Sequence, residues 1–439
     1  MTGVQTCALP ISMKFSNILK KNKSDLSYVS LTLVTTFVSF FKGFILMRYL
    51  SLNDLGIITL ISAVMGLFSM LQMGFLNGAY RIYSEQHKDS KDANDIIYTY
   101  FFIIEVCVFI GIIIFYFLNR IDVIELLYAL TASIFGALLV LNNSIRNILI
   151  ANKKVAEVNR LNLFSTITSF IFLLSVPFWG IYGALLVTFS IELVFYLMAI
   201  TKDKSLLPNK LNFNFKQYKW VLSYGFLPFI SGVIITYNMQ IETWSIAKFI
   251  STEALGVFYL PKLYISLFLL IPNAVSQLFF PDAVKAYTDF NFNKVRSILK
   301  KYILINTVVG IFLCIITILF ITPVISFVVP LHTVGIHFIW IIMPGLIIYT
   351  ILRPLDLVFY ASNILKPFLL ISFIGVIFTT IGLLSAGFLN RFSLELVALI
   401  KSLFYIVISF SLLGFYFYKK NTIWQHKNLK TYNLKIKDL

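Results

Sequence analysis

Long apolar segments recur along almost the whole chain, and short polar or basic stretches separate them. A helix needs about 20 mostly apolar residues to cross the hydrocarbon core of a membrane. The apolar stretch around Gly180 is about forty residues long, which is enough to cross the membrane twice. We therefore expect a turn at Gly180 that separates two spans. The pattern therefore predicts twelve membrane-spanning helices, over residues 27–49, 55–77, 96–118, 124–145, 160–179, 181–200, 220–246, 254–279, 302–327, 337–359, 366–388 and 394–418.

The composition excludes the main alternatives to a membrane protein. The 439 residues are 59% hydrophobic and only 13% charged, whereas soluble domains carry about 25% charged residues. A disordered chain would be poor in apolar residues, and a soluble globular enzyme would lack the polar surface it needs. We therefore predict an all-α polytopic membrane protein.

The positions of the basic residues predict its orientation. About 28 of the 36 Lys and Arg residues lie in alternate connections and at both ends of the chain, whereas the other connections hold Arg48, Arg120, Lys248 and Arg391. Cytoplasmic loops of membrane proteins are enriched in Lys and Arg, so both termini are predicted to be cytoplasmic. This distribution accounts for most of the net charge of +17, and no nucleic-acid partner is expected.

A short internal repeat predicts two lobes. The segment 48–57 reads RYLSLNDLGI and the segment 248–257 reads KFISTEALGV. Both lie on the predicted outer side, after the first span of a six-span half, which is typical of parallel repeats in transporters. Residues 1–12 are predicted to be an unrelated leader that is not native. A six-helix lobe (13–200), a cytoplasmic linker (201–219), a second six-helix lobe (220–418) and a basic tail (419–439) follow.

The chain lacks the residue patterns of an enzyme or a metal site. Its three cysteines and four histidines are scattered without paired or metal-ligand spacing. The outer connections are only a few residues long and hold no catalytic motif. No cofactor and no catalytic residue are therefore expected, and any function must lie within or between the helices.

Two stretches carry a family resemblance. Residues 48–81 and 224–281 resemble the openings of the two halves of the Wzx-type polysaccharide flippases, which belong to a superfamily with the MATE-type antiporters and the lipid II flippases. The second stretch has a Gly-x-x-Pro entry, an acidic residue late in the span and a Leu-Gly turn followed by Tyr. These residues are Gly225, Pro228, Glu242, Leu255, Gly256 and, one residue displaced, Tyr259. The family commonly has Asp at the position of Glu242.

The resemblance implies a function as well as a fold. It implies twelve helices in two lobes around a central cavity that opens alternately to the two sides. It also implies transport of undecaprenyl-diphosphate-linked oligosaccharide across the bacterial inner membrane for cell-surface polysaccharide biosynthesis. The bilayer, this lipid-linked glycan and other polysaccharide assembly proteins are then the expected partners.

Charged residues inside the apolar segments are the candidate site residues. Each costs at least about 2.5–3.5 kcal/mol to insert, so such residues usually face a cavity or a partner. Basic groups suit a diphosphate, which accepts charge-assisted hydrogen bonds, although a lysine can also extend to the membrane interface. The candidates for the diphosphate, including arginines near span ends, are Lys42, Lys262, Lys401, Arg48, Arg81 and Arg146.

The acidic candidates admit two roles. Glu105, Glu192 and Glu242 either carry a coupling ion or proton, or act as counter-ions of the lysines. Arg353 and Asp356 stand three residues apart around Pro354 and are expected to form a structural pair. Lys42 and Glu242 occupy equivalent positions in the repeat, so we also consider that they pair to close the outer side.

Two other functions compete with the flippase. A MATE-type multidrug or cation antiporter has the same fold, but a cavity for cations favours carboxylates, and Lys42 and Lys401 argue against it. A membrane enzyme of polysaccharide assembly would need a catalytic platform outside the membrane. A lipid II flippase is a closer relative, although that family usually has two more spans.

Overall fold

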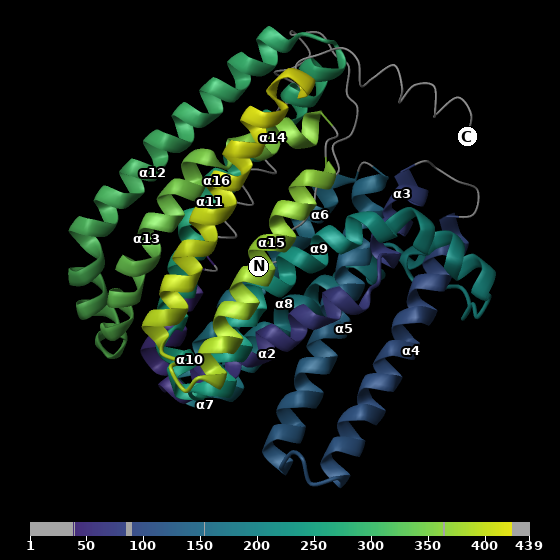
Figure 1. The fold of residues 1–439 in the computed structure, drawn as a ribbon. Coiled ribbons are helices and arrows are strands. Elements are labelled where there is room, and N and C mark those ends of the chain that lie inside the picture. The colour runs from purple at the N-terminus through teal and green to yellow at the C-terminus, as the bar shows by residue number, and fades with distance from the viewer. Residues whose placement is uncertain (1–37, 39, 85–89, 153, 363–364, 424–439) are drawn as a thin grey trace. The chain divides into compact units, whose positions relative to one another are not determined.

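The computed structural model describes residues 38, 40–84, 90–152, 154–362 and 365–423, and every regular element in these ranges is a helix (Figure 1). The described residues up to Tyr259 form an N-terminal unit, and those from Leu260 form a C-terminal unit. Nine helical stretches of the described chain are long and apolar enough to cross a membrane. The predicted span 27–49 falls largely outside the described residues, so the count of twelve and the cytoplasmic termini stay predictions.

The N-terminal unit begins with a helix over residues 40–49 and continues through α2 to α10. The helices are α2 (Leu52–Leu71), α3 (Phe75–Ser84), α4 (Ser90–Phe117), α5 (Val123–Ala151), α6 (Val155–Phe172), α7 (Val176–Trp179), α8 (Ile181–Lys202), α9 (Phe215–Phe249) and α10 (Thr252–Val257). Short 3-10 turns, η1 (Leu173–Ser175) and η2 (Lys204–Leu206), lie before α7 and after α8.

Local chemistry fixes where several of these helices begin. Asp122 and Glu125 form a reciprocal capping box at the start of α5, which satisfies backbone amides that have no partner inside the helix. Gly180 has a φ of 52°, a conformation that costs a residue with a Cβ, and it separates α7 from α8. The predicted turn between the fifth and sixth spans therefore lies where the sequence placed it.

One predicted span is broken. The apolar pattern predicts a single helix over 55–77, but α2 ends at Leu71 and α3 begins at Phe75. Met73 and Gly74 between them have φ values of 46° and 96°. These left-handed residues end the helical hydrogen-bond pattern, although the surrounding sequence is apolar throughout.

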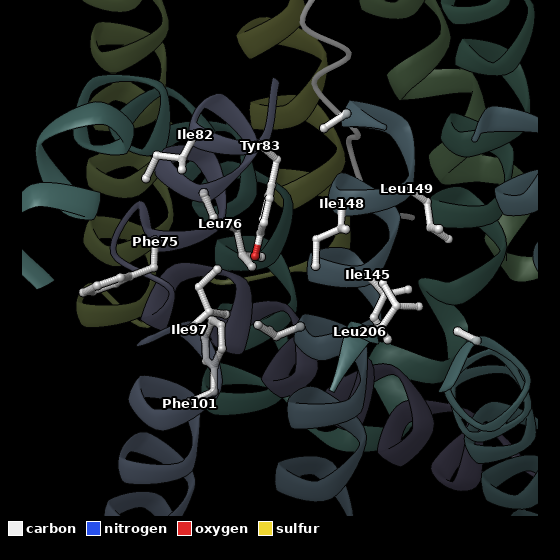
Figure 2. Close-up of a cluster of buried hydrophobic side chains, with 14 of the residues drawn as sticks. Phe75, Leu76, Ile82, Tyr83, Ile97, Phe101, Ile145, Ile148, Leu149 and Leu206 are labelled. Atoms are coloured by element: carbon white, nitrogen blue, oxygen red, sulfur yellow. The ribbon is translucent and has the colours of Figure 1, made fainter. Parts of the chain in front are cut away.

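The core of the N-terminal unit is a cluster of side chains from α3, α4, α5 and neighbouring segments (Figure 2). Phe75, Ile82, Ile97 and Ile145 belong to it, and the last three have no exposed surface. Leu206 from the 3-10 turn after α8 reaches the same cluster. The cluster therefore fixes the linker as well as the helices.

The predicted linker, 201–219, is held against α4 by hydrogen bonds. The side-chain amide of Asn94 donates to the backbone carbonyl of Leu206 at 3.1 Å, and the backbone amide of Asn209 donates to the Asp95 carboxylate at 2.8 Å. The backbone amide of Asn212 donates to the hydroxyl of Thr99 at 2.7 Å. The linker is thus a fixed part of the N-terminal unit.

The start of the linker also carries a network of charges. The hydroxyl of Ser205 donates to the carboxylate of Asp203 at 2.5 Å, and Lys154 lies 3.2 Å from the same carboxylate. The hydrogen bond from Ser205, followed by that from Lys154, lowers the pKa of Asp203.

The C-terminal unit consists of α11 to α16. These helices are α11 (Tyr259–Thr288), α12 (Phe292–Val328), α13 (Val334–Leu352), α14 (Pro354–Ala361), α15 (Leu365–Phe388) and α16 (Leu394–Ile423), with the 3-10 turn η3 (Pro330–His332) before α13. The predicted tenth span is interrupted at Arg353, because Pro354 begins a new helix. The two predicted lobes are defined by the sequence repeat, and their boundaries stay a prediction.

Helices α13 and α16 pack closely at Gly345. A Cβ atom there would overlap the backbone carbonyl of Ser402, and the Gly345 amide donates to the Ser402 hydroxyl at 3.2 Å. We expect Gly345→Ala to cost about 1–3 kcal/mol, because the overlap involves backbone that cannot move aside. The measurement is the thermal unfolding midpoint in detergent. Gly414→Ala is the control, since nothing lies within 4 Å of a Cβ there, and an equal midpoint for both variants would contradict the close packing.

Candidate functional site

The two copies of the repeat contact each other in the N-terminal unit. Helix α10 lies beside the beginning of α2 (Figure 1). Ser51 caps α2 by accepting a hydrogen bond from the Asp54 amide, and Ser251 caps α10 in the same way from the Ala254 amide. Equivalent residues of the repeat therefore start equivalent helices, and these starts meet.

Two glycines make this contact possible. A Cβ atom at Gly56 would overlap the carbonyl oxygen of Thr252, and a Cβ atom at Gly256 would overlap the carbonyl oxygen of Leu52. The contact is reciprocal, because Gly56 and Gly256 are equivalent positions of the repeat and so are Leu52 and Thr252. We name these four residues the glycine contact. On the predicted topology it lies on the outer side.

Lys42 lies in a cavity inside the N-terminal unit. The cavity has a volume of about 90 Å³, and its lining comes from residues 38 and 42, from α6, from the 3-10 turn η1 and from α8. Its lining residues are Val38, Lys42, Thr166, Ser169, Phe170, Leu173 and Ile191, and we name it the Lys42 cavity. The Glu192 carboxylate acts electrostatically on the Lys42 ammonium. The considered pair of Lys42 with Glu242 stays a prediction.

Glu192 is held in place from α5. The side-chain amide of Asn142 donates both to the Glu192 carboxylate at 2.7 Å and to its backbone carbonyl at 2.8 Å. Both residues are buried. Glu192 is therefore a fixed buried carboxylate next to the wall of the Lys42 cavity.

The other two acidic candidates lie on different helices. Glu105, on α4, accepts a hydrogen bond from the Ser133 hydroxyl at 2.6 Å. Glu242 is buried on α9, and so are its neighbours Asn238 and Thr243. Glu105 therefore has a hydroxyl partner on α5, and Glu242 is a buried carboxylate of α9.

The basic candidates of the N-terminal unit lie at helix ends. Arg146, in α5, donates to Asn143 at 3.0 Å, and its guanidinium lies 4.3 Å from the centre of the Phe195 ring. Arg48 is exposed beside the glycine contact. Arg81 belongs to α3, but its side chain lies outside the described part of the structure.

The C-terminal unit brings two cations and two tyrosines into a row. The Lys401 ammonium lies 5.7 Å from the centre of the Tyr405 ring, the Tyr405 and Tyr349 ring centres are 5.1 Å apart, and the Arg353 guanidinium lies 5.6 Å from the Tyr349 ring. Cations are attracted to the faces of such rings. We name these four residues the cation–tyrosine row. Lys401 is only 4% exposed, and it lies about two turns after the start of α16.

Polar groups of α12, α13 and α14 surround the Arg353 end of this row. Asp356 and Arg353 interact electrostatically, and the Asp356 amide donates to the Arg353 carbonyl at 2.9 Å. The amide of Asn306 donates to the Thr350 carbonyl at 3.1 Å. Lys262, the remaining basic candidate, is half-buried near the start of α11.

Several polar residues of these sites were not predicted. Uncharged polar residues are ordinary constituents of apolar helices, so nothing in the sequence distinguishes Asn142, Ser133, Thr166 and Ser169. The tyrosines of the cation–tyrosine row were not predicted either. A signal for these existed, because Tyr349 precedes Arg353 by four residues and Lys401 precedes Tyr405 by four, which places each pair on one helix face. Among the described residues, no group of His, Cys, Asp and Glu suited to a metal ion is present.

The fold is similar to that of solved membrane transporters. One is "Lipid II flippase MurJ, inward closed conformation", with a TM-score of 0.70 and 17% identity, covering 88% of this chain and 86% of that one. A second is an inward-facing multidrug resistance MATE transporter of the MOP superfamily, with a TM-score of 0.66 and 13% identity, covering 91% and 98%. These identities establish likeness of fold alone.

A third similar structure is a MOP superfamily transporter from Pyrococcus furiosus, described by the phrase "reverse polarity of binding pocket suggests different function". Its TM-score is 0.63 at 13% identity, and the alignment covers 95% of this chain and 100% of that one. Among proteins with curated functions, none matches the sequence significantly.

The family itself is shown by sequence. Residues 45–330 match the family described as "Polysaccharide biosynthesis protein", and this range is more than half of the chain. It includes both copies of the repeat and the polar residue Asn306 of the C-terminal unit. Of the residues that line the Lys42 cavity, it includes all except Val38 and Lys42. With a fold similar to that of these transporters, the chain belongs to the polysaccharide biosynthesis protein family.

Proposed function

We propose that this protein is a flippase that moves undecaprenyl-diphosphate-linked oligosaccharide from the cytoplasmic to the outer leaflet of the bacterial inner membrane. The observation that carries the proposal is the family match, which connects the chain with polysaccharide biosynthesis. The similar folds support transport rather than catalysis, since the solved relatives are described as a flippase and as transporters.

The cations of the cation–tyrosine row support an anionic cargo. A diphosphate must lose most of its water to cross the membrane, and charge-assisted hydrogen bonds from Lys and Arg replace that hydration. Lys401, in α16, and Arg353, at the junction of α13 and α14, lie at the two ends of the cation–tyrosine row. In this proposal they receive the diphosphate, and Arg146, Arg81 and Lys262 remain candidates for its entry or passage.

The glycine contact supports alternating access. Helices α2 and α10 meet at the glycine contact, which lies on the outer side on the predicted topology. In this proposal the contact belongs to a state that is closed to the outside, and these helix starts separate in a second state that releases the cargo outward. Because the contact is between backbones, it can form and break without rearranging long side chains.

The nearest competing function is export of cationic drugs. The two proposals differ in the sign of the cargo's charge, and buried Lys401 favours an anion. Expression in a strain that lacks its own polysaccharide flippase should restore surface glycan and confer no resistance to cationic dyes. Dye resistance without restored glycan, in a strain whose glycan resembles the native one, would overturn the proposal in favour of an antiporter.

A further inference from the structure

A second close backbone contact joins α3 to the first turns of α9. A Cβ atom at Gly78 would overlap the backbone carbonyl oxygen of Val221. Val221 has no exposed surface and belongs to the same apolar cluster as Ile82 of α3 (Figure 2). The contact is therefore buried, and it leaves no room for a side chain at residue 78. We name Gly78 and Val221 the α3–α9 contact.

This contact and the glycine contact lie at opposite ends of the same packed helices. Helices α2 and α3 carry Gly56 and Gly78, whereas α9 and α10 carry Val221 and Thr252, and the two pairs pack together between these positions. Midway along them, Gly66 faces the side chain of Gln240. On the predicted topology the glycine contact lies on the outer side, so the α3–α9 contact lies on the cytoplasmic side.

The first pair of helices is interrupted between the two contacts. Helix α2 ends at Leu71 and α3 begins at Phe75, with Met73 and Gly74 in left-handed conformations. The Tyr100 hydroxyl of α4 donates to the Leu71 carbonyl at 2.9 Å, which satisfies an acceptor that the end of a helix leaves open. The interruption is therefore held by a specific partner, and α3 is not rigidly continuous with α2.

The second pair is weakened between the same two contacts. Pro228 lies inside α9, about two turns after Val221. A proline has no amide hydrogen to donate to the carbonyl one turn earlier, so a helix bends readily at this residue. Each side of the α3–α9 contact thus has a bending point between that contact and the glycine contact.

We propose that the α3–α9 contact is an inner gate that opens independently of the glycine contact, with Met73, Gly74 and Pro228 as its hinges. Both contacts are formed in this structure, so these helices are closed against each other at both ends. The inference rests on the proposed transport cycle, because a carrier that takes cargo from one side and releases it on the other needs a gate at each side. It assigns residues to the gate through which the cargo enters.

The test uses two reporter cysteines in a cysteine-free background. They are Val221→Cys at the α3–α9 contact and Leu255→Cys beneath the glycine contact, and neither position has exposed surface. We expect Gly78→Ala to raise the rate at which a membrane-impermeant thiol reagent labels Val221→Cys by about 5–150-fold. The added Cβ atom disfavours only the state in which α3 and α9 touch, so Leu255→Cys should stay protected in this variant.

The side of labelling is a second prediction. Right-side-out and inverted membrane vesicles expose opposite faces of the protein to the reagent. Val221→Cys in the Gly78→Ala variant should react in only one kind of vesicle. Leu255→Cys in the Gly56→Ala variant should react in only the other kind.

Two further variants control for local packing. Gly66→Ala is matched in chemistry, but its Cβ atom meets only the end of the flexible Gln240 side chain, so both reporters should stay protected. Pro228→Ala restores an amide donor inside α9 and should slow the labelling of Val221→Cys several-fold in the protein that retains Gly78. This second variant tests the gate without an added Cβ atom at the contact, even if Gly78→Ala fails to insert.

Three results would overturn the proposal. If Gly78→Ala exposes both reporters, the two contacts open together and not independently. If it exposes neither, the α3–α9 contact is not a gate. An unchanged labelling rate in Pro228→Ala would show that α9 does not bend there to open the contact. None of these measurements uses cargo, so a failed gate leaves the flippase assignment to its own test, and a failed assignment leaves the accessibility results unchanged.

Discussion

Replacing Gly56 or Gly256 with alanine is expected to abolish transport while leaving the protein in the membrane. The added Cβ atom would overlap a backbone carbonyl of the facing helix start, at Thr252 or Leu52 respectively. Overpacking of this kind costs about 1–3 kcal/mol, and the cost falls on the state in which α2 and α10 touch. A shift of that size changes the ratio of two states by about 5–150-fold, so the closed outer side should become rare.

The change of state can be measured directly. Leu255 has no exposed surface beneath the glycine contact, so a cysteine introduced by Leu255→Cys in a cysteine-free background should resist a membrane-impermeant thiol reagent. Adding Gly56→Ala should make it reactive from the outer side. Gly111→Ala and Gly232→Ala are matched controls, because a Cβ atom at either position has nothing within 4 Å. Normal transport by Gly56→Ala, with the introduced cysteine still protected, would show that the glycine contact is not a gate.

Lys401→Met is expected to reduce glycan export by about 10–150-fold. The ammonium lies buried beside the Phe404 and Tyr405 rings, and methionine retains its packing while removing its charge. A hydrogen bond to a charged group contributes about 1.5–3 kcal/mol, and the loss should be felt where the diphosphate passes. The measurement is surface glycan in a complemented flippase-deficient strain, normalised to the amount of protein in the membrane.

Two substitutions control for this result. Lys401→Arg keeps the positive charge and should retain part of the export, since both side chains bind phosphate with different geometry. Lys248→Ala removes an exposed lysine and should leave export unchanged. Export at the wild-type level by Lys401→Met, at equal membrane abundance, would exclude Lys401 from the path of the cargo.

The sequence predicted the helical architecture and the family resemblance because both depend on local patterns. Apolar length identifies a span wherever it occurs, and the turn at Gly180 follows from one residue's backbone freedom. The interruption at Met73 and Gly74 was missed because hydropathy does not register a change in φ. The length and composition of a segment therefore show that it is apolar, but they do not show where a helix within it breaks.

The arrangement of the candidate sites depended on contacts that the sequence does not encode locally. The repeat placed Gly56 and Gly256 at equivalent positions, but only packing shows that each faces the backbone beside the other. Lys42 and Glu192 are far apart in the chain, and their interaction requires α8 to lie against the helix over residues 40–49. The rotation of a helix about its axis decides which neighbour a charge meets, and packing sets that rotation.

The most direct test of the flippase assignment uses purified protein in sealed liposomes. An undecaprenyl-diphosphate-linked oligosaccharide with a fluorescent label is placed in one leaflet, and its arrival in the other is followed with a membrane-impermeant quencher. The assignment predicts transfer that the wild type supports and that Lys401→Met and Gly56→Ala lose. Transfer no faster than in protein-free liposomes, by wild-type protein that is folded and correctly inserted, would contradict it.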